Sequence, residues 1–214
     1  MEKLNAYIGI DPSVNSTGIC IRYGDTEHLY ILKPDKLTKR EQKFNELDTS
    51  LKYLVYNKID LKPFSEENHL HEKYKTYNLI AAADGVCDII MENVPWKIID
   101  KAYIVQEGIS YGSSARTKSV YDLAGLNYLL RKNLLGNGMY DLTIVPPSEI
   151  KKFATGAGNS NKDTMVALFI ALHPELSEVP KCDDIADAFF MSEYAEYIYP
   201  PEMTQKSPLT IVNE

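Results

Sequence analysis

The chain has 214 residues, 44% of them hydrophobic and 25% charged, with a formal net charge of −7. This length fits one globular domain with a core large enough to fold alone, and the composition excludes a disordered or fibrous chain. The sequence has neither an uncharged apolar run of about 18 residues nor a leader before its first apolar stretch, so we expect a cytoplasmic protein without a membrane partner.

Three short apolar segments near the N-terminus predict strands joined by tight turns, an antiparallel meander. They are Ala6–Ile10, Gly18–Tyr23 and His28–Leu32. From Lys39 to Tyr56 apolar residues recur at helical spacing, which predicts a helix. The charged, irregular stretch from Asp60 to Tyr77 is interpreted as surface, within an insertion of about residues 35–80.

The second half of the chain alternates between strand and helix patterns. The expected elements are a buried strand over Cys87–Asn93, a helix over Val120–Leu135, a strand over Leu142–Val145, and three helices over 148–153, 162–172 and 183–197. This order predicts an α/β fold with a central mixed sheet of five strands flanked by helices, formed by residues 1–199 and followed by a tail at 200–214. Such folds place their sites at the carboxyl ends of strands.

Four carboxylates stand where these elements could bring them together. Asp11 directly follows the first strand, Glu92 lies near the end of the expected Cys87–Asn93 strand, and Asp184 and Asp187 share one face of the last helix. Converging carboxylates repel one another without a cation, so we expect divalent metal. Oxygen ligands suit Mg²⁺, with Mn²⁺ as a substitute, and two ions roughly 4 Å apart would support phosphodiester hydrolysis.

The motifs that carry these residues resemble those of the RuvC family of Holliday-junction resolvases, within the RNase H-like superfamily. GIDPSVNSTG is similar to the first motif of that family, DIIMENV to the second, EIKKFATGAGNSNKDTM to the third and DDIADA to the closing acidic motif. The longer segment between Pro34 and Ala81, the Pro95-Trp96 pair and the tail depart from the bacterial pattern. They indicate a divergent member of viral or bacteriophage type.

The resemblance implies roles for particular residues. Asp11, Glu92, Asp184 and Asp187 would be the catalytic metal ligands, with Asp184 favoured over its neighbour Asp183. Lys162 would act at the scissile phosphate, and the residues expected at the DNA are Lys151, Lys162, Trp96, Arg116 and Lys118. Trp96 would either stack on an unpaired base or pack in the core.

The charge distribution is compatible with DNA despite the acidic total. Between Lys97 and Lys162 nine basic residues face five acidic ones, a local balance of +4, so a basic face on an acidic body is possible. The expected protein is a magnesium-dependent endodeoxyribonuclease, a homodimer that nicks two strands of a four-way junction. The Val120–Leu135 helix is the candidate dimer surface, because two symmetric nicks need two sites.

Several alternatives compete with this interpretation. The same fold could belong to a viral packaging nuclease, to an RNA-processing enzyme, or to a junction-binding protein without catalysis. The sequence has no ATPase segment, which argues against a complete packaging motor. The glycine-rich segment before Lys162 is not a nucleotide site, because no Gly directly precedes that lysine and Asp163 stands where a P-loop has Ser or Thr. A sugar kinase or actin-like ATPase would need a longer chain.

Overall fold

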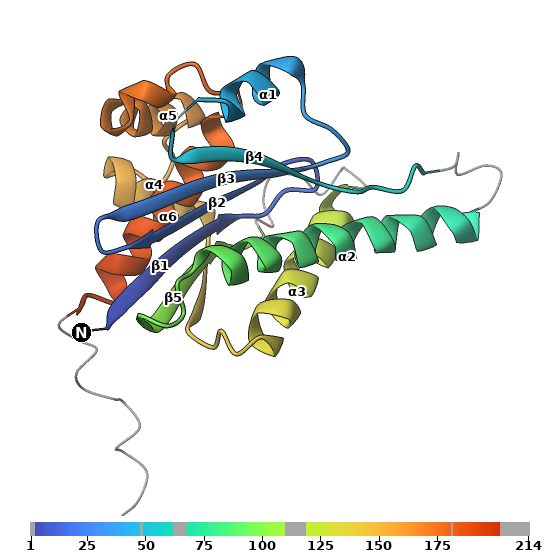
Figure 1. The fold of residues 1–214 in the computed structure, drawn as a ribbon, viewed down its shortest axis with the longest axis horizontal. Helices are drawn as coiled ribbons and strands as arrows, with labels where there is room; N and C mark the ends of the chain where they lie inside the picture. The colour runs from blue at the N-terminus through green and yellow to red at the C-terminus, as the bar shows by residue number, and fades with distance from the viewer. Residues whose placement is uncertain (1–2, 48, 62–67, 110–118, 181, 202–214) are drawn as a thin grey trace, which may run out of the picture.

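The computed structural model describes residues 3–47, 49–61, 68–109, 119–180 and 182–201 (Figure 1). The strands are β1 (Leu4–Asp11), β2 (Thr17–Tyr23), β3 (Thr26–Pro34), β4 (Leu51–Tyr56), β5 (Ile99–Glu107) and β6 (Leu142–Val145). The helices are α1 (Lys39–Asn45), α2 (Asn68–Asn93), α3 (Ser119–Gly136), α4 (Pro147–Thr155), α5 (Lys162–Leu172) and α6 (Cys182–Ile198), with a 3₁₀ turn at Pro174–Leu176. None of these described helices is both long and apolar enough to span a membrane.

The strands form one mixed sheet in the order β4-β3-β2-β1-β5-β6. Strands β1, β2 and β3 are the expected antiparallel meander, whereas β5 runs parallel to β1 and β6 runs parallel to β5. The predicted fold class, a mixed α/β fold with a central sheet flanked by helices, is therefore confirmed. The sheet has six strands among the described residues rather than five, because β4 adds to β3 at one edge.

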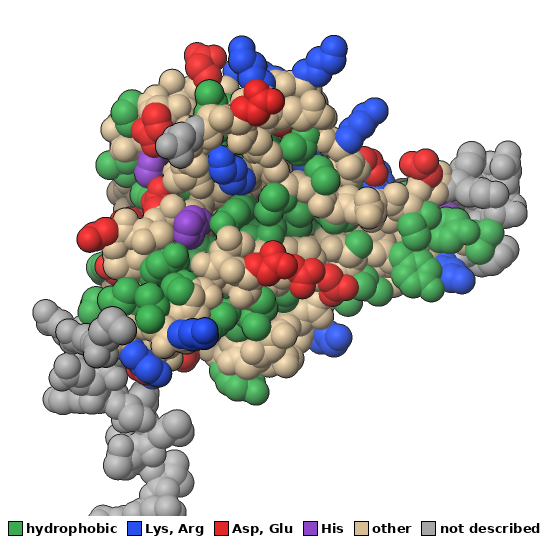
Figure 2. Space-filling model, viewed as in Figure 1, with side chains coloured by type: hydrophobic (Ala, Val, Ile, Leu, Met, Phe, Trp, Pro, Cys, Tyr) green, Lys and Arg blue, Asp and Glu red, His purple; other side chains and the backbone are tan. Residues whose placement is uncertain are grey.

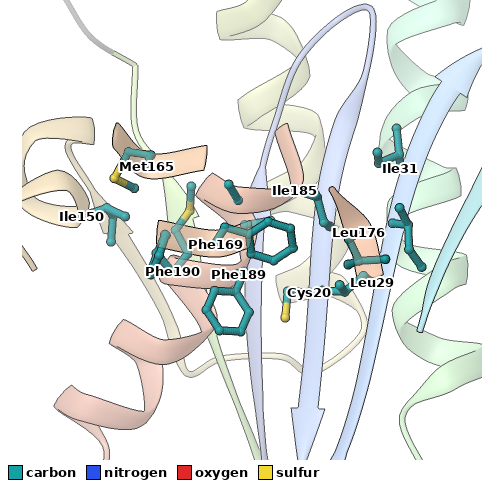
Figure 3. Close-up of a cluster of buried hydrophobic side chains, with 14 of the residues drawn as sticks. Cys20, Leu29, Ile31, Ile150, Met165, Phe169, Leu176, Ile185, Phe189 and Phe190 are labelled. Carbon is teal, nitrogen blue, oxygen red and sulfur yellow. The ribbon is translucent and has the colours of Figure 1, made fainter. Parts of the chain in front are cut away.

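Helices cover the two faces of the sheet as separate layers (Figure 1). Helix α6 lies against β1, β2 and β5, with α4 and α5 packed beside it, and α2 and α3 pack together on the other face. The core beneath α6 is rich in aromatic and branched side chains, including Phe169, Phe189, Phe190 and Ile185 (Figure 3). Along each strand, alternate residues point to one layer or the other.

The predicted helix over Lys39–Tyr56 is wrong in its second half. Helix α1 begins with a capping box, in which Thr38 accepts from the backbone of Glu41 and the Glu41 carboxylate accepts in return, but it ends at Asn45. The segment LKYLVY then forms β4, with Leu51 and Tyr53 buried. Its apolar residues fit a helical period as well as a strand period, and pairing with β3 decides between them.

The predicted strand over Cys87–Asn93 is also wrong, because these residues are the last two turns of α2. The buried residues of this helix include Ala82, Val86 and Ile90, which are spaced four apart and form the stripe that faces the sheet. The stretch interpreted as an irregular surface insertion contributes the beginning of α2, from residue 68 to residue 77.

Two glycines allow α6 to lie directly on the sheet. A Cβ atom on Gly9 would stand 1.9 Å from the Ala188 carbonyl oxygen, and one on Gly18 would stand 2.1 Å from the Asp184 carbonyl oxygen. Real side chains do not tolerate such distances, so any larger residue would push the helix away. The two glycines thus set the height of α6, and with it the height of Asp184, above β1 and β2.

We predict that Gly18→Ala destabilises the protein by about 1–3 kcal/mol or more, because the new methyl group overlaps the backbone of α6. Chemical denaturation monitored by circular dichroism measures the change. Gly136→Ala is the matched control, since a Cβ atom there meets nothing within 4 Å. Equal stability of Gly18→Ala and Gly136→Ala would show that α6 is not held at contact distance.

Candidate active site

Two carboxylates lie side by side at one edge of the sheet. Asp11 is the last residue of β1 and Glu107 is the last residue of β5. The parallel register pairs Ile10 with Gln106, so both strands end at the same level. Side-chain alternation then directs both carboxylates to the α6 face, because Tyr7 and Val105, an even number of residues earlier on their strands, belong to the core beneath α6.

Helix α6 brings further carboxylates to this edge. Asp184 and Asp187 lie three residues apart near its N-terminus and share one helical face. Both contribute to raising the pKa of Asp11, which places them close to the strand-end pair. The structure thus gathers the predicted Asp11, Asp184 and Asp187, and it adds Glu107 to them.

The cluster is electrostatically strained. The pKa of Asp11 lies well above its ordinary value, first because the side chain is buried and then because of the charge of Glu107 and a hydrogen bond to it, with smaller contributions from Asp187 and Asp184. Burial, followed by Glu107, raises the pKa of Asp187 to about 6. Carboxylates that resist ionisation in this way are characteristic of sites that take a cation.

Two lysines border the carboxylates. The Lys162 ammonium, at the start of α5, lies 3.0 Å from the Asp183 carboxylate, which raises the pKa of Lys162. Lys162 and Lys151 of α4 both lower the pKa of Asp187. Asn161 caps α5 by accepting from the Thr164 amide and so fixes the turn from which Lys162 projects. The Lys162 side chain is 65% exposed and accessible to a ligand.

Glu92 is not part of this cluster, in contrast to the sequence-based prediction. It lies in the last turn of α2, and the turn over residues 94–98 leads from there to Ile99, the first residue of β5. The nine residues of β5 span roughly 26 Å at about 3.3 Å per residue, so Glu92 lies toward the opposite end of the sheet from Glu107. It is exposed, and with Asp84 and Asp88 it forms an acidic row on α2 (Figure 2).

The sequence pattern does not single out Glu107, because Glu92 already supplies an acidic residue near the end of an expected strand. The local pattern of Glu107 nevertheless matches that of Asp11: an acidic residue closes a buried apolar strand, here YIVQE, and Gly108 follows. The buried side chains leading into Cys87–Asn93 are spaced four residues apart, which indicates a helix. A helix there means that Glu92 does not lie at the end of a strand.

The residues predicted to bind DNA are only partly located at the site. Lys151 and Lys162 border the carboxylates, whereas Arg116 and Lys118 lie outside the described residues. Trp96 lies in the turn between α2 and β5, toward the opposite end of the sheet, where its indole N–H donates to the Met91 carbonyl oxygen at 2.9 Å. It is 38% exposed, so it is not a core residue.

The donor set fits a hard divalent cation, because the four groups that the structure brings together are all carboxylates. Within the described part of the chain, no three His, Cys, Asp or Glu side chains are already arranged as a metal cage. Asp11 and Glu107 instead hydrogen-bond to each other, and Lys162 pairs with Asp183. A cation bound here would compensate the repulsion among the carboxylates.

The fold and site together define a mixed α/β protein with carboxylates at the ends of two central strands. No family model and no curated protein matches the sequence. Among solved structures, the chain is similar to Thermus thermophilus RuvC, with a TM-score of 0.48, 12% identity and coverage of 91% of this chain and 96% of that one.

Two further solved structures are similar to this chain. The same bacterial RuvC in complex with Holliday junction substrate gives a TM-score of 0.49 at 13% identity, covering 95% of this chain and 98% of that one. The yeast mitochondrial Holliday junction resolvase Ydc2 gives 0.46 at 13% identity, covering 92% and 82%.

We predict that Asp187→Asn stabilises the metal-free protein in a pH-dependent way. The pKa of Asp187 rises from 3.8 to about 6 on folding, so between these values the folded state keeps a proton that the unfolded state has lost. The ionised carboxylate therefore costs stability as pH rises through this window, and above it the full penalty applies. The gain from Asp187→Asn should be about 3 kcal/mol at pH 7.5 and about half of that at pH 5.

Urea denaturation in EDTA at the two pH values measures this difference. Asp163→Asn is the control, because that carboxylate is exposed on α5. A gain for Asp187→Asn that is absent, or that does not change with pH, would contradict the crowding of the carboxylates.

Proposed function

We propose that this chain is a divalent-metal-dependent endonuclease that cuts branched DNA, with the four-way junction as its substrate. The observation that supports this most strongly is the convergence of Asp11, Glu107, Asp184 and Asp187 at one edge of the sheet, with two lysines beside them. Carboxylates gathered in this way bind hard cations, and cations bound beside lysines favour phosphodiester chemistry.

In this proposal the four carboxylates would hold Mg²⁺, for which Mn²⁺ can substitute. When bound, a pair of such ions activates water and stabilises the leaving oxygen of a phosphodiester. Burial of Asp11 beneath α6 fixes its orientation and keeps bulk water from it. Lys162 and Lys151 would contact the DNA backbone and hold the scissile phosphate over the carboxylates.

The central prediction separates Glu107 from Glu92. Glu107→Gln should abolish cleavage while junction binding stays nearly intact, because the loss of a carboxylate removes a ligand and reduces repulsion toward phosphate. Asp11→Asn should behave in the same way. Glu92→Gln is the matched control, and it should cleave like the wild type because Glu92 lies on the exposed face of α2. Cleavage of a labelled four-way junction with Mg²⁺ is the measurement.

The same assay tests the choice of substrate when cleavage of the junction is compared with cleavage of a flap, a linear duplex and an RNA–DNA hybrid. If the protein cleaves the hybrid or the linear duplex faster than the four-way junction, the junction is not its preferred substrate. Full activity of Glu107→Gln would overturn the assignment of the site. Lys162→Ala should slow junction cleavage and flatten the dependence of log K on log salt by about one unit, which tests its contact with phosphate.

A homodimer is the second part of the proposal. Helix α3 leaves three apolar side chains exposed at intervals of seven residues: Tyr121 at 83%, Tyr128 at 61% and Leu135 at 42%. Residues seven apart lie on nearly the same side of a helix, so they form one stripe. An exposed apolar stripe of this length favours contact with the same stripe of a second copy across a two-fold axis.

We predict that the double variant Tyr121→Glu, Leu135→Glu is monomeric, because two buried like charges would face each other across the two-fold axis. Sedimentation velocity over a range of concentrations measures the mass. Tyr140→Glu is the control, since Tyr140 is 76% exposed but lies outside α3. A wild-type protein that remains monomeric at micromolar concentrations would contradict the proposed dimer.

A further inference from the structure

Gln106 is a polar residue in an otherwise apolar layer. It lies on β5 one residue before Glu107 and is completely buried. By alternation along the strand it points away from α6, toward α2 and α3, as does Ile104 two residues earlier. Its neighbours on the adjacent strands are Ile10 and Ile144. A hydrophobic side chain would satisfy this environment, so a buried amide there calls for an explanation.

The Gln106 amide belongs to a chain of hydrogen bonds that leads into α3. Its Nε2 donates to Oδ1 of Asn127 at 2.7 Å, and Asn127 is itself buried. Asn127 Nδ2 donates to the Leu123 carbonyl oxygen at 3.0 Å, which fixes the orientation of the amide. The Arg131 guanidinium donates to the same Asn127 Oδ1 at 3.2 Å. Three side chains thus connect β5 with the middle of α3.

Gln106 occupies a critical position on β5. Its pairing with Ile10 is the last β1–β5 pair, and Glu107 lies one residue beyond it. Beyond that point the ladder continues between β5 and β6, through the pairing of Glu107 with Val145 and a 2.7 Å hydrogen bond from the Gly108 amide to the Val145 carbonyl oxygen. Fixing Gln106 therefore fixes the place from which the Glu107 carboxylate projects toward Asp11.

We propose that Gln106, Asn127 and Arg131 form a positioning relay that holds Glu107 against Asp11 and ties the carboxylate site to α3. The inference rests on the proposed function, in which Glu107 is a metal ligand. Gln106 acts through the backbone of the next residue and does not touch the metal or the substrate, so it is a positioning residue.

The relay contains buried polar atoms that lower the stability of the folded protein. Oε1 of Gln106 and Nε of Arg131 are buried without a hydrogen-bond partner among the described residues, and such atoms carry a desolvation penalty. Its outer end reaches the surface of α3, where the Arg131 guanidinium lies 5.2 Å from the centre of the Tyr128 ring. Tyr128 belongs to the exposed stripe of α3, so the relay extends from the carboxylate edge to that stripe.

The test uses the full chain with Gln106→Met, which keeps the length of the side chain and removes the amide, together with Asn127→Leu and the double variant. Calorimetry with Mn²⁺ measures metal affinity in the absence of DNA, and single-turnover cleavage of the junction with Mg²⁺ measures the rate. Both are recorded far below the melting temperature of each variant, so that loss of stability alone does not change them.

For Gln106→Met we expect Mn²⁺ affinity and single-turnover rate each to fall about tenfold, the lower end of the range for residues that orient metal ligands. Junction binding without metal should stay within about twofold, because no phosphate contact is lost. The double variant should lose no more than the worse single variant, since both substitutions break the same relay. Asn133→Ala is the control: it removes a 2.6 Å bond from α3 to Asp84 of α2 that does not involve β5, and it should leave affinity and rate unchanged.

Unchanged Mn²⁺ affinity and rate in Gln106→Met, or losses that simply add in the double variant, would overturn the relay. If Gln106→Met does not fold, the variants Arg131→Met and Arg131→Lys test the relay instead. Arg131 joins the hydrogen-bond network from the surface of α3. Arg131→Met should weaken Mn²⁺ binding and Arg131→Lys, which keeps a donor, should restore it; equal affinities would overturn the relay. A wild type that binds Mn²⁺ but cuts no branched DNA would refute the proposed function and leave the relay to be judged by affinity.

Discussion

The parallel pairing of β1 with β5 is the constraint on which the candidate site depends. It brings two strand ends to the same level, and the period of two along a strand then directs Asp11 and Glu107 to the same face. Neither residue is near the other in sequence, since most of the chain's first half separates them. The hydrogen-bonded ladder, rather than any local motif, holds two carboxylates together against their repulsion.

The second constraint is the close contact of α6 with the sheet. Gly9 and Gly18 have no Cβ atoms, which lets the helix backbone touch the strands and places Asp184 and Asp187 over the strand ends. Packing of Phe189 and Phe190 in the core beneath α6 provides apolar burial that offsets the electrostatic cost of the carboxylates. The site is therefore assembled by the core, which holds its carboxylates close together despite their mutual repulsion.

The sequence predicts the parts of this arrangement that have a local signature. The meander β1–β3 follows from alternating apolar residues and turns, and Asp11, Asp184 and Asp187 follow from strand-end and i, i+3 spacing. The segments 51–56 and 87–93 differ from the prediction because short apolar runs fit both periods. That error carried Glu92 into the predicted site in place of Glu107, whose partnership with Asp11 exists only through the parallel register.

The end of β5 connects the two layers of the molecule. Consecutive residues there point to opposite faces, so Glu107 joins the carboxylates under α6 while Gln106 joins Asn127 beneath α3. A displacement of α3 would pull on Gln106, the residue that adjoins Glu107, because the hydrogen bond from Gln106 to Asn127 joins β5 directly to α3. Through β5, the position of α3 on one face of the sheet could affect the position of the Glu107 carboxylate on the other face without a conformational change of the whole sheet. In the proposed dimer and metal site, assembly through α3 and cation binding at the carboxylates would be linked through the peptide unit that joins Gln106 to Glu107.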